Sequence, residues 1–136
     1  PTLLKNGEQE IIDLALNPVG VQLAMKGLQD SLSKDYGTGS LLRYGARDRD
    51  PIFNVNGVRL WGKTGTAQAP PHQPTGIPKL DHSWFLVMAS NKNETKPSVI
   101  VAVLIEHGGS GGRVAGPIAN QVIHALQDEG YLGGVR

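Results

Sequence analysis

Two apolar runs in the second half of the sequence constrain its fold more than any other feature. Residues 83–89 read SWFLVMA and residues 99–105 read VIVAVLI, with a polar turn over residues 91–97 between them. Such runs predict strands, and a short polar connection predicts that the two strands are neighbours in one sheet. Because the second run contains no polar residue, we expect it to be a central strand covered on both faces.

The N-terminal region has helical periodicity. Residues 8–16 carry apolar side chains at helical spacing and predict a short helix. Asn17 then offers an N-cap and Pro18 an N1 residue for a second helix that continues to about residue 34, with Gly37 beyond its end.

The middle of the chain predicts a hairpin. Residues 52–55 and 58–61 are both rich in strand-forming side chains, and they flank Asn56-Gly57, a strong signal for a tight turn. The predicted α+β fold is an antiparallel sheet of at least three strands flanked by helices. Its elements are helices at about 8–34, strands at about 52–67, 82–90 and 98–106, and a last helix at about 117–128. A glycine-rich loop from His107 to Gly116 leads into this last helix, which Pro117 begins, and Gly130 lies just beyond its end.

Composition excludes several classes of function. The net charge is +1, so no electrostatic surface for nucleic acid is expected. The absence of cysteine excludes disulfides and thiolate metal sites. The four histidines, at positions 72, 82, 107 and 124, have no metal-ligand spacing. We therefore predict no metal, no cofactor and no nucleic-acid partner.

The segment GKTGT at residues 62–66 is the most informative motif, and two interpretations compete for it. Read together with Gly57, it satisfies G-x-x-x-x-G-K-[ST], the pattern of a nucleotide-binding phosphate loop. A phosphate loop must lead directly into a helix, whereas residues 58–61 are bulky strand formers and prolines follow at 70–71. A nucleotide-binding module that uses Gly57–Thr64 therefore remains only a remote alternative.

The second interpretation is the Lys-Thr-Gly strand of serine acyl-transferases that react with penicillin. The ammonium of Lys63 attracts a substrate carboxylate, which the hydroxyl of Thr64 can also bind. Gly65 lets the acyl group lie close to the strand. The amide of Thr66 can donate to a tetrahedral oxyanion, and its hydroxyl can touch the carboxylate.

Other short motifs stand in the order expected for one family. They are Gly37-Thr38-Gly39, His82-Ser83-Trp84-Phe85, Glu106-His107-Gly108-Gly109 and Ala115-Gly116-Pro117. From about residue 14 to 126 the chain resembles a class B penicillin-binding protein, most like the elongation-specific type. Trp61 departs from the small or aliphatic residue expected there.

The resemblance implies that residues 1–136 are the C-terminal portion of a penicillin-binding, serine-type transpeptidase domain. The implied activity is D,D-transpeptidation of peptidoglycan stem peptides, with β-lactam antibiotics acylating the same serine. The resemblance places the parent on the periplasmic face of the cytoplasmic membrane, anchored by an N-terminal helix outside these residues. A D,D-carboxypeptidase and a β-lactam-sensing domain share the fold and remain alternatives.

The expected serine nucleophile is not among these residues. Ser31 and Lys34 fit Ser-x-x-Lys, but Ser31 falls near the end of its predicted helix, and a nucleophile of this type belongs at a helix N-terminus. No Ser-x-Asn stands between Lys34 and Lys63. We therefore expect the chain alone to be inactive and to need the upstream part of the same domain.

Overall fold

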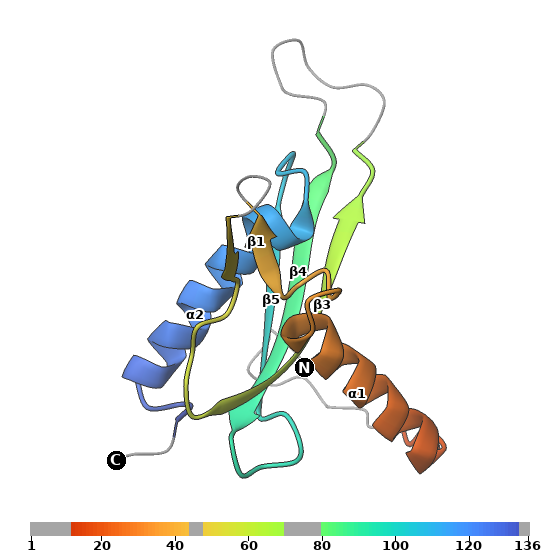
Figure 1. The fold of residues 1–136 in the computed structure, drawn as a ribbon. Coiled ribbons are helices and arrows are strands. Elements are labelled where there is room, and N and C mark those ends of the chain that lie inside the picture. The colour runs from red at the N-terminus through yellow and green to blue at the C-terminus, as the bar shows by residue number, and fades with distance from the viewer. Residues whose placement is uncertain (1–11, 44–47, 70–79, 134–136) are drawn as a thin grey trace, which may run out of the picture.

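The computed structural model describes residues 12–43, 48–69 and 80–133. Its elements are α1 (Pro18–Ser33), β1 (Leu41–Arg43), β2 (Arg49–Pro51), β3 (Val58–Ala67), β4 (His82–Asn91), β5 (Val99–Ile105), the π-helical turn η1 (Gly111–Ala115) and α2 (Gly116–Asp128). Strands β3, β4 and β5 form an antiparallel sheet in that order, and β1 pairs with β2 separately. Figure 1 shows α2 lying along one side of the sheet and α1 projecting away from it. The α+β prediction is confirmed.

The central strand β4 has two different faces. Ser83, Phe85, Val87 and Ala89 are buried, whereas Trp84 and Leu86 between them are exposed. Side chains alternate across a strand, so every second residue of β4 points to α2.

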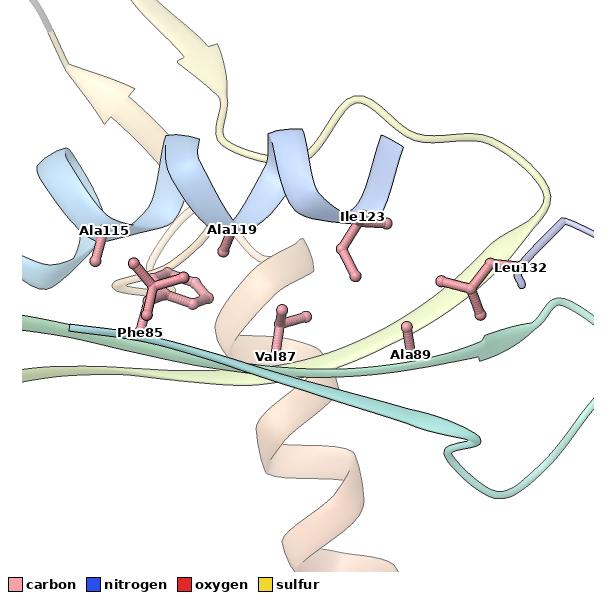
Figure 2. Packing of buried hydrophobic residues seen from close by; sticks show 8 residues of the cluster. Phe85, Val87, Ala89, Ala115, Ala119, Ile123 and Leu132 are labelled. Carbon is pink, nitrogen blue, oxygen red and sulfur yellow. The ribbon is translucent and has the colours of Figure 1, made fainter. Parts of the chain in front are cut away.

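The hydrophobic core fills the space between the sheet and α2. Figure 2 shows the labelled core side chains meeting between the two layers: Phe85, Val87, Ala89, Ala115, Ala119, Ile123 and Leu132. Ala115 and Ala119 are fully buried. Alanines four residues apart lie on one face of a helix, and their small side chains let that face approach the sheet closely.

The last helix agrees with the sequence. It was predicted over about 117–128 and runs from Gly116 to Asp128. Gly130 follows its end with a φ of 76°, and the amide of Tyr131 donates to the carbonyl of Leu126. This is the glycine-terminated helix end that the sequence predicts. Before it, the predicted glycine loop contains the turn η1, which the sequence did not indicate.

The predicted helix over residues 8–16 is wrong for its described part. Residues 12–17 are not helical, and Ala15 has a φ of 46°. The carboxylate of Asp13 accepts the N–H of Ala15, a local hydrogen bond that competes with helix formation. Residues 8–11 lie outside the described residues.

Asn17 is the N-cap of α1, as predicted. Its side-chain oxygen accepts hydrogen bonds from the amides of Val19 at 2.9 Å and of Gly20 at 3.4 Å, and Pro18 begins the helix.

The change Asn17→Ala is expected to lower the free energy of unfolding by about 1 kcal/mol, because two helix amides lose their partner. Urea unfolding monitored by circular dichroism measures this. Asn17→Asp is the control, since a carboxylate also caps, and equal losses in the two variants would contradict the capping role.

The predicted strand over about 52–67 is confirmed only from Val58 onwards, and the predicted hairpin around Asn56-Gly57 is wrong. Strand β3 begins only at Val58, and residues 52–57 do not pair with it. Ile52 is buried, and the side chain of Asn54 bonds to Asn120 and His124 of α2. Side-chain contacts with α2 thus take the place of strand pairing, although Gly57 keeps a positive φ of 76°.

Strand β5 is not central, contrary to the prediction. It pairs with β4 on one side and is an edge of the three-stranded sheet among the described residues. One face packs towards α2, while the other exposes Ile100 by 65% and Leu104 by 45%. The prediction was wrong because no described residue covers this second face. We call it the open face, defined by its exposed apolar residues Trp84, Leu86, Ile100 and Leu104.

Candidate functional site

The predicted site residues Lys63, Thr64, Gly65 and Thr66 all lie in the second half of β3. The strand is continuous from Val58 to Ala67 and does not lead into a helix. An extended backbone cannot wrap its amides around a phosphate, so Gly57–Thr64 does not form the loop that nucleotide binding requires.

From Lys63 onwards, the outer edge of β3 is free among the described residues. The register pairs every residue from Val58 to Ala67 with β4 on the inner side. On the outer side, the hydroxyl of Ser31 at the end of α1 lies 2.5 Å from the carbonyl oxygen of Gly62. Among the described residues no further strand pairs with this edge.

The direction of each backbone group follows from this register. In an antiparallel strand, the N–H and C=O of one residue point to the same side, and those of the next residue point to the other. The carbonyl of Gly57 accepts from Lys92 on the inner side, whereas that of Gly62 meets Ser31 on the outer side. The N–H and C=O of Thr64 and Thr66 therefore point to the free outer edge.

The side chains of Lys63 and Thr64 project to opposite faces of the sheet. Lys63 is exposed beside Leu86 on the open face, and its ammonium donates to the carbonyl of Thr64 at 2.7 Å. Thr64 pairs opposite Phe85, and so its side chain lies on the α2 face. The site therefore has a cation on one face of the strand and a hydroxyl on the other.

Thr38 is a site residue that the sequence reasoning did not single out. Its hydroxyl lies 2.7 Å from the hydroxyl of Thr64, although 26 positions separate them. In the sequence, Thr38 stands out only through the family-like loop Gly37-Thr38-Gly39, and that loop is the signal that could have pointed to this contact. Gly39 packs against Leu32 and Phe85, which holds the turn against the core.

Glycines let η1 lie directly on β3. A Cβ on Gly111 would overlap the carbonyl oxygens of both Gly65 and Trp84. A Cβ on Gly65 would come 3.1 Å from the Cβ of Trp84, on the other face. The backbone of the Lys-Thr-Gly segment is therefore supported from the α2 side by η1.

Ser31 occupies a structural position. It lies in the last turn of α1, and its hydroxyl is 3.0 Å from the carbonyl of Leu28 as well as 2.5 Å from that of Gly62. Both neighbours are hydrogen-bond acceptors, and neither can take a proton as a base would. Ser31 thus joins α1 to the strand edge.

The three histidines that the structure describes do not gather into a metal site. The rings of His82 and His107 lie 4.8 Å apart, and His124 contacts Asn54. His72 lies outside the described residues. Within residues 12–43, 48–69 and 80–133, no group of three histidine, cysteine or acidic side chains is placed to hold a metal ion. None of the helices in these ranges has both the length and the apolarity that a bilayer crossing requires.

Comparison with known proteins gives two findings. Residues 6–124 match the family described as "Penicillin binding protein transpeptidase domain". The chain is also similar to the peptidoglycan D,D-transpeptidase MrdA of Haemophilus influenzae, with 29% identity over 110 residues. That similarity covers 75% of this chain and spans 15% of the length of the relative. No solved structure matches the chain significantly.

The matched region contains α1, the whole three-stranded sheet and most of α2. It therefore includes every element that positions the Lys-Thr-Gly strand. The chain belongs to the penicillin-binding protein transpeptidase domain family.

Proposed function

We propose that this chain is the C-terminal part of a class B, elongation-type peptidoglycan D,D-transpeptidase. The observation that carries the proposal is the extended strand β3, whose outer edge from Lys63 to Ala67 has no partner strand among the described residues and carries the outward amide of Thr66. A peptide or a lactam ring can pair with such an edge through main-chain hydrogen bonds.

We assign the substrate-facing roles by this geometry. The outward N–H of Thr66 donates to the oxyanion, and Gly65 leaves the strand surface low enough for the acyl group. The ammonium of Lys63 supplies positive charge on the open face. If Thr38 donates to the hydroxyl of Thr64, the proton of Thr64 is free to bind a substrate carboxylate.

The reaction needs a serine from outside this chain. Its hydroxyl oxygen attacks the carbonyl of the penultimate D-alanine, and the terminal D-alanine leaves after its nitrogen takes a proton. The amine of a neighbouring stem peptide then attacks the acyl-enzyme, which forms the cross-link and returns the proton to the serine. β-Lactams acylate the same serine.

The open face indicates where the rest of the domain packs. Its residues Trp84, Leu86 and Ile100 are exposed by 42%, 40% and 65%. In addition, α1 buries none of its side chains fully. An apolar surface of this kind is normally covered. We propose that the upstream part of the domain covers it and brings the Ser-x-x-Lys and Ser-x-Asn motifs to the Lys63 side.

We further propose that the complete parent acts on the periplasmic face of the cytoplasmic membrane, held there by an N-terminal helix. A D,D-carboxypeptidase would transfer the acyl group to water, and a β-lactam sensor would keep it. These alternatives use the same strand and differ in the acceptor.

Labelling with a fluorescent penicillin tests the proposal. The complete parent is expected to become covalently labelled, and this chain alone is expected to stay unlabelled because it has no activated serine. With stem-peptide substrates, the parent should release D-alanine and form cross-linked dimers. Release without dimers would favour the carboxypeptidase. Labelling of the isolated chain at Ser31 would overturn the assignment of the nucleophile.

A further inference from the structure

A cavity of about 360 Å³ lies between residues 35–43 and the start of η1. Its lining includes the turn that contains Thr38 and the start of η1 at Gly112 and Arg113. A Cβ on Gly112 would lie 3.6 Å from the Cγ2 of Thr64. The cavity therefore adjoins the side chain of Thr64.

The cavity carries net positive charge. Arg43 and Arg113 are two cations of its lining, and Asp35 is the one acidic side chain that the structure places there. One Nη of Arg43 lies 3.5 Å from the backbone carbonyl of Asp35, which directs this guanidinium to the cavity. Among the described residues the structure records no ion pair for either arginine. Two guanidiniums beside hydroxyl groups form a site for a carboxylate.

The register of β3 indicates which carboxylate reaches this cavity. If the oxyanion of the penultimate D-alanine meets the amide of Thr66, that residue lies opposite Thr66. In an antiparallel pairing the peptide then runs towards Thr64, and its terminal carboxylate lies beside Thr64 and Thr38. A parallel pairing would place the carboxylate beyond Ala67. The cations Lys63, Arg43 and Arg113 all lie at the Thr64 end, and charge complementarity therefore favours the antiparallel direction.

We propose that Arg113, assisted by Arg43, binds the terminal carboxylate of the donor peptide and the ring carboxylate of β-lactams, in concert with the hydroxyl of Thr64. The proposal rests on the proposed function. It makes Arg113 a specificity-determining residue that distinguishes a free C-terminal carboxylate from an uncharged end. Arg113 belongs to η1. The same turn thus supports the strand through Gly111 and binds the terminal carboxylate of the substrate through Arg113.

The test uses the complete parent and two peptides, one ending in D-Ala-D-Ala with a free carboxylate and the other ending in D-Ala-D-alaninamide. It measures the release of D-alanine from the first peptide and of D-alaninamide from the second. The wild type is expected to prefer the free acid. In Arg113→Gln, kcat/KM for the acid should fall about tenfold while that for the amide stays within about twofold, because only the acid loses a charge-assisted contact. Arg113→Lys should retain part of the preference. The matched control is Lys92→Gln, which removes an exposed cation in the turn between β4 and β5.

The outcomes separate the inference from the proposed function. If the wild-type parent neither reacts with penicillin nor releases D-alanine, the proposed function fails. If the parent is active but Arg113→Gln leaves the ratio of kcat/KM for the acid to kcat/KM for the amide unchanged, the carboxylate site is refuted. An equal fall in kcat/KM for both peptides is one form of this outcome. A ratio that falls in Arg113→Gln but not in Lys92→Gln supports it.

Discussion

Replacing Lys63 by alanine in the complete parent is expected to lower the rate constant of acylation by penicillin about 10²–10³-fold. In the proposed mechanism, negative charge develops beside β3 as the serine attacks, and the ammonium of Lys63 is held there by its 2.7 Å hydrogen bond to the carbonyl of Thr64. Removing one preoriented donor from such a site costs about 3–4 kcal/mol of transition-state stabilisation. Stopped-flow measurement with a fluorescent penicillin gives this rate constant directly.

Stability separates this effect from a fold defect. The side chain of Lys63 is exposed, and its loss should change the free energy of unfolding by less than about 0.5 kcal/mol. Lys92→Ala is the matched control, because this lysine is also exposed but lies at the far end of the sheet. If the Lys63→Ala protein is folded and is acylated at the wild-type rate, Lys63 does not contribute to acylation.

Replacing Gly111 by alanine is expected to produce the second large effect, a loss of more than about 3 kcal/mol in the free energy of unfolding. The new Cβ would overlap the carbonyl oxygens of Trp84 and Gly65 and approach the amide nitrogen of Gly65 to 3.0 Å. All three atoms belong to strand backbone and cannot move aside as a flexible side chain can, so η1 must separate from the sheet. Urea unfolding of the parent's transpeptidase domain measures the loss.

Gly27→Ala provides the opposite result in the same assay. A Cβ at this position of α1 meets no atom within 4 Å, and alanine is the better helix former. This variant should gain about 0.5–1 kcal/mol. We also expect Gly111→Ala to slow penicillin acylation and Gly27→Ala to leave it unchanged. If Gly111→Ala is as stable as the wild type, η1 does not support β3 in the way described.

The local sequence pattern was sufficient to predict those elements whose structure depends only on their own residues. The apolar runs of β4 and β5 became strands because β-branched and aromatic side chains favour an extended chain. The cap at Asn17 and the stop at Gly130 are local backbone chemistry, and both occur as predicted.

Prediction failed where distant residues compete for a segment. Residues 52–57 have the composition of a strand, but Ile52 and Asn54 contact the core and α2 instead. The apolar run of β5 predicts two covered faces, and the described residues cover one of them. An apolar pattern in a sequence indicates that side chains are buried, but it does not indicate which part of the protein buries them.

The amino-acid sequence alone was enough to establish that Lys63, Thr64, Gly65 and Thr66 lie next to one another on one extended segment, because the conformation of this segment depends on neighbouring residues. The fold had to bring the remaining parts of the site to that segment: Ser31 to Gly62, Thr38 to Thr64, and Gly111 to Gly65. These contacts join residues 26 to 46 positions apart. No local propensity specifies them, because they form only when the core between the sheet and α2 fixes the spacing of β3, η1 and the end of α1.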